Sequence, residues 1–127
     1  MGFRTDLEAM VLAALQEGPL HGYGIVRAIR GRSEGVLKLG EGQLYPILHR
    51  LEEEGLVSGD WEMQEGKPPK KLYALTEQGG NSLSKRRKEW GAFAKAVGNV
   101  MVAPGESATK GDSTAIGFAR KEAKGNA

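Results

Sequence analysis

The fold is decided by the stretch Gly40-Glu41-Gly42-Gln43-Leu44-Tyr45-Pro46-Ile47-Leu48-His49-Arg50-Leu51-Glu52-Glu53-Glu54-Gly55-Leu56-Val57. Its apolar residues are spaced three and four apart, as on one face of a helix: Leu44, Ile47, Leu48 and Leu51. Side chains that form hydrogen bonds stand at other positions: Gln43, Tyr45, His49 and Arg50. Gly55 is expected to end the helix, and Leu56-Val57 opens a strand. A helix with one apolar and one polar face, followed by a hairpin, is typical of segments that read a DNA groove.

Pro46 bears on where this helix begins. In the first turn of a helix a missing N–H has little cost, because those donors have no partner within the helix. Deeper in the helix, proline would cause a kink. We therefore expect the regular part of the helix to begin near Leu44.

Two further helices are expected before this stretch. The first has Thr5 or Asp6 as its N-cap, and its apolar stripe consists of Leu7, Met10, Val11, Ala14 and Leu15. It ends at Gln16-Glu17-Gly18-Pro19, because glycine caps a helix and proline prevents its continuation. The second helix spans roughly residues 22–32.

Two short strands are expected after the opening stretch, at residues 56–62 and 70–75. Between them lies Met63-Gln64-Glu65-Gly66-Lys67-Pro68-Pro69, which glycine and proline mark as a turn. This segment is too long for a two-residue hairpin. We expect a flexible loop that carries lysines at and after its tip: Lys67, Lys70 and Lys71.

A long helix follows, with Thr76 as its N-cap. Its apolar residues are spaced as in a short coiled-coil seam: Leu83, Trp90, Phe93, Ala94, Val97, Val100 and Met101. Each glycine within it costs about 1 kcal/mol relative to alanine, so the helix needs packing to persist. This pattern predicts a partner helix from a second copy. From Pro104 the periodicity is lost, which predicts a disordered tail at residues 104–127.

Composition limits the classes of function. With 127 residues and a hydrophobic content of 39%, the chain is expected to form one domain with a small core that oligomerisation completes. There is no cysteine, and the two histidines stand on different elements, so neither a metal site nor a cofactor is expected. No nucleophile–base pair or phosphate loop indicates an enzyme. Because no long apolar run or signal peptide is present, we expect a cytoplasmic protein with no membrane partner.

Three motifs resemble those of one known family, the PadR-type transcriptional regulators. They are His21-Gly22-Tyr23-Gly24-Ile25, the stretch Gly40 to Val57, and Gly66-Lys67-Pro68-Pro69-Lys70-Lys71-Leu72-Tyr73-Ala74-Leu75-Thr76-Glu77-Gln78-Gly79. The resemblance implies a mainly α fold with a small β-hairpin. It places a winged helix-turn-helix at residues 4–75 and a single dimerisation helix at residues 76–103, as in the short form of the family.

The resemblance also implies a function. It is that of a homodimeric repressor that binds a pseudo-palindromic operator in double-stranded DNA and is released by a small aromatic or drug-like effector. One departure concerns the hairpin turn, which is the wing of a winged helix. There the family commonly has Gly-Arg-Pro-Arg-Lys, and this chain has Gly66-Lys67-Pro68-Pro69-Lys70-Lys71. Lysine attracts phosphate but lacks the planar fork of arginine, so this wing is expected to contact phosphates.

Seven residues are expected to contact DNA: Gln43, Tyr45, His49, Arg50, Lys67, Lys70 and Lys71. Arginine pairs well with guanine and glutamine with adenine, whereas a tyrosine hydroxyl suits a phosphate. A modest net charge of +2 and the acidic run Glu52-Glu53-Glu54 keep an alternative open. In that alternative, the winged helix is a protein-interaction adaptor without specific DNA binding.

A second set of residues is expected to line an effector site or a dimer seam: Leu7, Met10, Trp90, Phe93 and Val97. In the first reading, two symmetry-related Trp90 rings stack on a flat ligand between the dimer halves. In the second, Trp90 packs in the seam and binds nothing. The sequence leaves both open.

Overall fold

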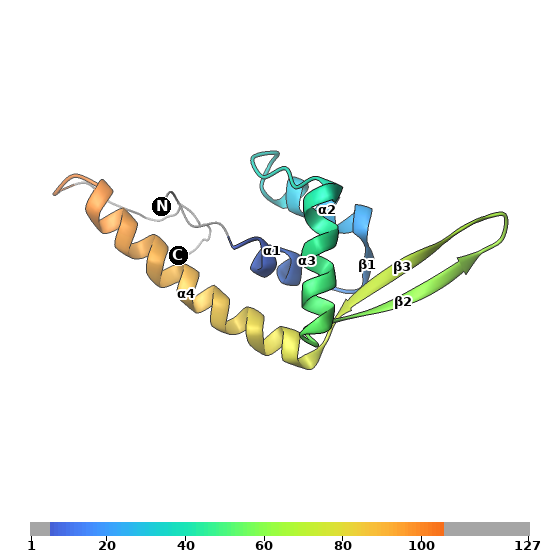
Figure 1. Cartoon of the computed structure of the whole chain (residues 1–127). Coiled ribbons are helices and arrows are strands. Elements are labelled where there is room, and N and C mark those ends of the chain that lie inside the picture. Colours follow the sequence, from blue (N-terminus) through green and yellow to red (C-terminus); the bar gives the residue numbers. More distant parts are fainter. Residues whose placement is uncertain (1–5, 106–127) are drawn as a thin grey trace. The chain divides into compact units, whose positions relative to one another are not determined.

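The computed structural model of the chain describes residues 6–105. In chain order it contains α1 (Leu7–Ala14), β1 (Leu20–His21), α2 (Gly22–Arg32), α3 (Glu41–Glu53), β2 (Val57–Gln64), β3 (Lys67–Leu75) and α4 (Glu77–Met101) (Figure 1). The predicted fold class, mainly α with a small β-hairpin and a long last helix, is confirmed. The chain divides into two compact units, with the boundary between Arg87 and Lys88 inside α4.

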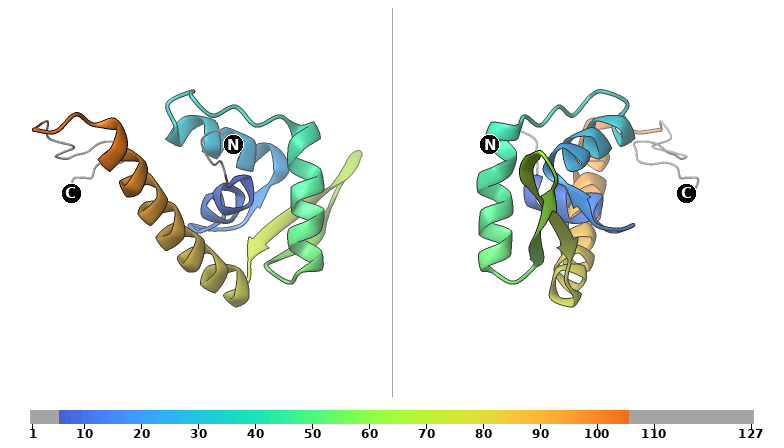
Figure 2. Two further views of the ribbon diagram at one scale, coloured as in Figure 1. Left: turned by 60° about the vertical axis from the view of Figure 1, so that its left-hand side comes forward. Right: turned by 90° about the vertical axis from the view of Figure 1, so that its right-hand side faces the viewer.

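One apolar core joins the elements of the first unit. Helices α1, α2 and α3 lie against one another (Figure 2). From α3 come the four residues that the sequence predicts, Leu44, Ile47, Leu48 and Leu51, none more than 6% exposed. The rest of the core consists of Val11, Leu12, Ala14, Leu15, Ile25, Val26, Ile29, Leu39, Val57, Tyr73 and Leu83. Leu83 therefore belongs to this core and not to the apolar seam expected along the last helix.

Helix α1 starts as predicted but ends at Ala14, before the predicted end at residues 16–19, because the N–H groups of Leu15, Gln16 and Gly18 bond three residues back instead of four. Asp6 caps α1, because its Oδ1 accepts a hydrogen bond from the N–H of Ala9 at 2.9 Å. Thr5, the alternative cap, lies outside the described residues. Gly18 follows α1 with a φ of +150°, a conformation that suits glycine. Helix α2 covers the predicted residues 22–32.

Helix α3 begins earlier than the position of Pro46 suggested. The expected start near Leu44 is wrong, because the helix starts at Glu41 and holds Pro46 in its interior. Gly40 is the N-cap: its N–H donates to Gln43 Oε1 at 3.3 Å, and its carbonyl accepts from the N–H groups of Gln43 and Leu44. Proline has no N–H to donate to the carbonyl of Gly42 one turn earlier, and Gly42 is exposed.

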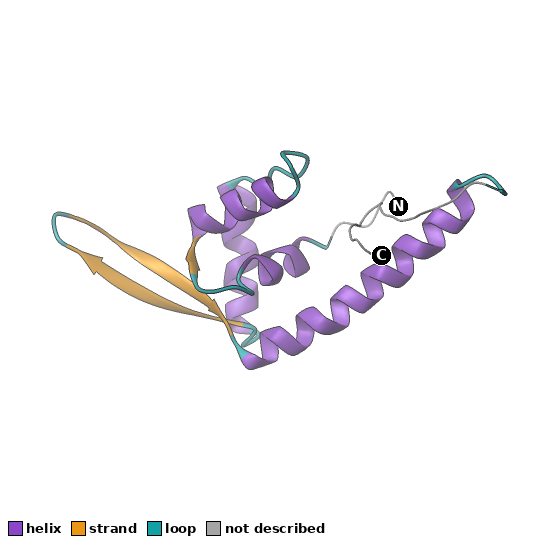
Figure 3. Cartoon of the chain, turned by 180° about the vertical axis from the view of Figure 1, so that it is seen from behind, coloured by secondary structure: helices purple, strands orange, loops and turns teal. Residues whose placement is uncertain are grey.

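The sheet has three antiparallel strands in the order β1-β3-β2. Strand β1 is not predicted by the sequence, because two residues show no periodicity; it pairs Leu20 with Tyr73 and His21 with Leu72. Beyond β1, strands β2 and β3 continue as a two-stranded ribbon that extends away from α1, α2 and α3 (Figure 3). We call the hairpin from Val57 to Leu75 the wing.

The turn of the wing is tighter than expected. The prediction of a long flexible loop at residues 63–69 is wrong, since the strands continue to the pair Gln64–Lys67 and only Glu65 and Gly66 connect them. Gly66 permits this turn with a φ of +72°. The two prolines are accommodated by a register shift between the pairs Glu62–Lys70 and Gln64–Lys67, because proline cannot donate to the ladder.

Helix α4 starts where predicted. Thr76 caps it, because the Oγ1 of Thr76 accepts a hydrogen bond from the N–H of Gly79 at 3.0 Å. The helix then runs without interruption to Met101 despite its glycines. The expectation of a disordered tail falls, from residue 106 onward, outside the described residues.

Candidate nucleic-acid interface

Helix α3 has one buried edge and one edge that faces away from the core. With about 3.6 residues per turn, the edge opposite the buried leucines carries Gly42, Pro46, His49 and Glu53, all exposed. Of the four predicted DNA-contacting residues of this helix, only His49 lies on that edge. Gln43 and Arg50 lie on one flank of the helix, and Tyr45 lies on the other. The polar side of α3 therefore presents its predicted residues in three directions.

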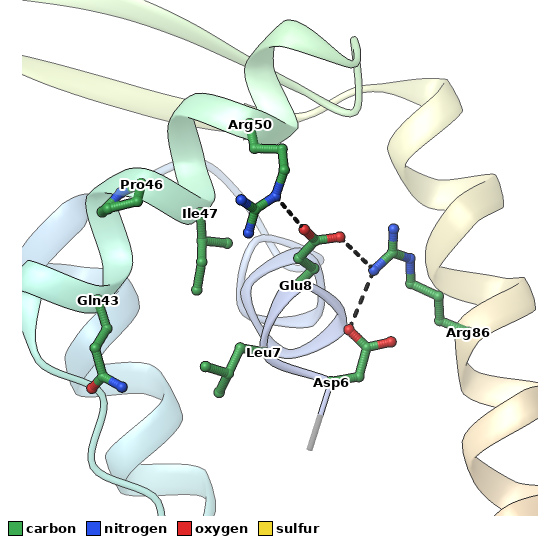
Figure 4. A pocket seen from close by; sticks show the side chains of 8 residues that line it. All are labelled: Asp6, Leu7, Glu8, Gln43, Pro46, Ile47, Arg50 and Arg86. Atoms are coloured by element: carbon green, nitrogen blue, oxygen red, sulfur yellow. Dashed lines mark hydrogen bonds and ion pairs between the residues drawn. The ribbon is translucent and has the colours of Figure 1, made fainter. Parts of the chain in front are cut away.

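Gln43 and Arg50 border one hollow, shown in Figure 4. It has a volume of about 630 Å³ and is lined by Asp6, Leu7, Glu8, Gln43, Pro46, Ile47, Arg50 and Arg86. Gln43 is engaged in capping the start of α3 through the N–H of Gly40. Of the two predicted residues on this flank, Gln43 thus has a structural role at the helix terminus.

Arg50 is engaged by a carboxylate of α1. Its Nε donates to Glu8 Oε2 at 2.7 Å, and the Nη1 of Arg86 donates to Glu8 Oε1 at 2.9 Å. Arg86 also donates to Asp6 Oδ1 at 3.3 Å (Figure 4). The hydrogen bond from Arg50, followed by the contribution of Arg86, holds the pKa of the Glu8 carboxyl below its usual value of 4.5 against an opposing effect of burial. Glu8 therefore stays ionised at neutral pH.

Glu8 and Arg86 are not among the functional residues that the sequence predicts. They contact one another across 78 positions of the chain, and Arg50 contacts Glu8 across 42. Helical periodicity relates positions only three and four apart. No local signal could therefore have joined these three residues.

His49 has a partner on its own helix. Its Nε2 lies 3.3 Å from Glu53 Oε2, one turn further along α3, and both side chains are about two-thirds or more exposed. An exposed pair of this kind contributes little to stability. His49 is thus accessible on the outward edge of α3.

Tyr45 points toward the wing. Together with Lys70 and Lys71 it lines a groove of about 390 Å³, completed by His21, Gly22, Tyr23, Trp61, Pro69 and Tyr73. Tyr45 is 46% exposed and packs against Gly22 at the start of α2. This groove combines aromatic rings with cationic side chains, which are groups that bind phosphates and bases.

The three wing lysines differ in their surroundings. Lys67 and Lys70 are exposed. Lys71 is held at the base of the wing, where its Nζ donates to Glu52 Oε1 of α3 at 2.9 Å and lies 5.5 Å from the ring centres of both Trp61 and Tyr73. The hydrogen bond to Glu52 raises the pKa of Lys71 above its usual value of 10.5. Lys71 thus connects the wing to α3, a role that its place in a lysine run does not reveal.

His21 also connects two elements. It occupies the N-cap position of α2 but makes no side-chain cap bond there. Its Nε2 lies instead 2.8 Å from Glu62 Oε1 on β2. The start of α2 is thereby fixed to the wing.

The residues predicted for an effector site or dimer seam are divided between the two units. Leu7 and Met10 are partly buried against the core of the first unit. In the second unit, the ring centres of Trp90 and Phe93 lie 5.8 Å apart with planes inclined by 38°. Trp90 is 46% exposed, and Phe93 and Val97 are half-buried.

Within residues 6–105, no group of three or more acidic or histidine side chains is arranged to hold a metal ion. None of the helices in the same range combines the length and the apolar character that a membrane crossing requires.

Comparisons with known proteins identify relatives. The model of the transcriptional regulator PadR-like family matches residues 11–85. The chain is 32% identical over 84 residues to the transcriptional regulator YqjI of Escherichia coli, covering 66% of this chain and 39% of that protein. It is 31% identical over 77 residues to the negative transcriptional regulator PadR of Bacillus subtilis, covering 61% and 42%. The chain thus spans about two-fifths of the length of these relatives.

Solved structures resemble the fold. A transcriptional regulator from Clostridium thermocellum superposes with a TM-score of 0.69 at 27% identity, covering 76% of this chain and 93% of that one. Bacillus subtilis PadR, solved in complex with operator DNA, superposes with a TM-score of 0.58 at 24% identity, covering 84% and 52%. The second likeness concerns the fold alone.

Proposed function

The chain belongs to the PadR-like family of transcriptional regulators, and from this premise we propose that it is a homodimeric repressor of double-stranded operator DNA. The main support is the form of α3, which buries one edge in the core and leaves the opposite edge exposed beside an extended wing. An α-helix with a free edge fits the major groove, and a projecting hairpin can follow the neighbouring backbone. The description of the Bacillus subtilis relative as a negative regulator supports repression.

The proposed contacts are those expected from the sequence, with roles refined by their surroundings. His49 on the outward edge of α3 meets base edges or the groove wall. Tyr45 and Lys70 line one groove and contact the phosphate backbone together, and Lys67 contacts it nearer the tip of the wing. Arg50 and Lys71 first have to leave Glu8 and Glu52, so their share in binding is smaller than an unpaired side chain would give.

Dimerisation is proposed to use the second unit. There α4 exposes large apolar side chains, with Trp90 at 46%, Met101 at 68% and Val100 at 84% exposure. A second copy of the helix would remove this surface from water. In such a dimer the two α3 helices would stand about 34 Å apart, one turn of DNA.

The effector part of the proposal rests on Trp90 and Phe93. Two half-exposed rings at 5.8 Å offer an aromatic surface on which a flat ligand can stack. Titration of tryptophan fluorescence with phenolic compounds and aromatic cations tests this idea. Quenching that saturates in the Trp61→Leu variant but not in Trp90→Leu is expected, and the reverse pattern would assign the ligand to the wing.

DNA binding is tested by selecting sites from random DNA with the full chain, followed by gel shifts at several salt concentrations. A palindromic consensus with half-sites one turn apart is expected. The double variant Lys67→Ala/Lys70→Ala should lower the slope of log affinity against log salt by about 1.8, or 0.9 per lost phosphate contact. The exposed Lys95, which lies in the second unit, provides the matched control Lys95→Ala. If selection returns no consensus, the adaptor alternative replaces this proposal.

A further inference from the structure

Glu8 lies between two arginines from different helices. One carboxylate oxygen accepts from Arg50 of α3 at 2.7 Å, and the other accepts from Arg86 of α4 at 2.9 Å (Figure 4). All three residues belong to the first compact unit. A single acidic side chain of α1 thus connects the helix proposed to read DNA with the helix that leads into the second unit.

The two arginines are held unequally. Arg86 has further partners in Asp6 Oδ1 and in Ser82 Oγ, which accepts from its Nε at 3.0 Å. Its side chain is 22% exposed, like that of Glu8 at 23%. Arg50 is 52% exposed and is bound by Glu8 alone among the described residues. Arg50 is therefore the member of the trio that can leave.

Space for that movement is present. The hollow of about 630 Å³ borders Arg50 and extends along α3 past Pro46 to Gln43. Pro46 lies on the outward edge of the helix, so an arginine side chain that swings toward it reaches the surface that would face DNA. Asp6 meanwhile caps α1 and keeps the backbone at Glu8 fixed.

We infer that Glu8 is a positioning residue that holds Arg50 away from DNA until phosphates or base edges displace it. The inference rests on the proposed function of α3. Arg86 weakens this hold, because it shares the negative charge of the same carboxylate. Any ligand or dimer contact that moves Arg86 away from Glu8 would strengthen the hold on Arg50 and lower the affinity for DNA.

The first test compares Glu8→Gln with Glu54→Gln in the full chain. Glu54 is an exposed carboxylate at the end of α3 and forms no ion pair with another described residue, so its loss controls for a general change of charge. Glu8→Gln should raise the affinity for the selected operator by about two- to fivefold over Glu54→Gln, the range expected for one exposed ion pair. In an Arg50→Gln background, the two substitutions should have equal effects.

The second test uses neighbouring arginines of α4. Arg86→Met leaves Glu8 to Arg50 alone and should lower operator affinity by about two- to fivefold relative to Arg87→Met. Arg87 carries the same charge but donates to Gln16 instead. With Gln at position 8, Arg86→Met and Arg87→Met should bind DNA equally.

The outcomes separate the two proposals. Wild-type protein that binds no DNA at low salt overturns the proposed function and this inference with it. Wild-type protein that binds, with Glu8→Gln no tighter than Glu54→Gln, overturns the inference alone. Because Arg86→Met also removes contacts to Asp6 and Ser82, its folding is checked by circular dichroism, and the cycle of Glu8 with Arg50 decides the matter if this variant does not fold.

Discussion

Gly79 of α4 packs directly against the backbone carbonyl of Leu56, and a Cβ atom at this position would overlap that oxygen. The contact holds the first turn of α4 against the residue that precedes the wing. Thr76 supports it, since its Oγ1 accepts from Gly79 N–H and donates to the carbonyl of Gly55 at 2.7 Å. The packing of the first turn of α4 against Leu56 therefore depends on the absence of a side chain at position 79.

Gly79→Ala is accordingly expected to destabilise the protein by about 3 kcal/mol or more, because the obstructing atom is backbone and cannot rotate away. Gly80→Ala is the matched control. Nothing lies within 4 Å of a Cβ there, so this variant should be stabilised by about 0.5–1 kcal/mol through helix propensity. Urea denaturation of both variants measures the difference. Equal midpoints would contradict the close packing at Leu56.

Substitutions at a second pair of glycines are expected to have different effects on DNA binding but similar effects on stability. A Cβ at Gly22 would meet the ring and hydroxyl of Tyr45, whereas a Cβ at Gly24 would only touch Leu20 at 3.4 Å or more. Since Tyr45 is half exposed, its ring can move aside at small cost. Gly22→Ala should therefore leave stability within about 1 kcal/mol of Gly24→Ala and yet weaken DNA binding, because Tyr45 is displaced from the groove that it shares with Lys70. If Gly24→Ala weakens DNA binding to the same extent, the effect of Gly22→Ala is not due to the displacement of Tyr45.

Sequence patterns predicted those parts of the fold that depend on local spacing. The buried edge of α3, the Asp6 and Thr76 caps and the bounds of α2 follow from periodicity and end signals. The predicted start of α3 and the predicted long loop at residues 63–69 are wrong for the same reason: proline does not end the element at either place. In the structure, α3 continues through Pro46, and a register shift accommodates Pro68 and Pro69 in the wing.

The candidate site was predictable only as a set of residue types. Exposure of Tyr45, His49 and Arg50 follows from the helical pattern, but their partners do not. Glu8 and Glu52 reach Arg50 and Lys71 from other elements, and such pairing across the fold leaves no trace in local spacing. Gly79 illustrates the same limit. From the sequence, it is a residue that lowers the stability of the helix; in the structure, no larger residue fits at this position beside the carbonyl of Leu56.

Lys71 is expected to behave differently from its neighbours in the wing. Lys67→Ala and Lys70→Ala should each lower the slope of log affinity against log salt by about 0.9. Lys71→Ala should lower it by less, because Glu52 already neutralises this charge. Binding isotherms at four salt concentrations measure the slopes. If the three variants have equal slopes, Lys71 leaves Glu52 and contacts a phosphate when the protein binds DNA.

Because Lys71 pairs with Glu52, we also expect the folding stability to fall at alkaline pH. The folded-state pKa of Lys71 is raised above 10.5 by its hydrogen bond to Glu52. The stability that it contributes is fully present below the unfolded-state pKa and is lost as the pH rises through the folded-state value. Wild-type protein should therefore lose more stability than Lys71→Met at high pH. Lys70→Met serves as the control, since Lys70 is exposed.

The ion pairs of Glu8 lead us to expect the opposite dependence, a loss of folding stability at acidic pH. Its pKa is lowered below 4.5 in the folded state, first by the hydrogen bond from Arg50. The stability that it contributes is present above the unfolded-state pKa and is lost as the pH falls through the folded-state value. Between about pH 6 and pH 3, wild-type protein should therefore lose more stability than Glu8→Gln, by up to about 1 kcal/mol for each of the two ion pairs. Urea denaturation at both pH values, with Glu54→Gln as the control, measures this difference. Parallel loss in all three proteins would show that Glu8 is not held by the arginines in solution, and Arg50 would then be free to meet DNA without displacement.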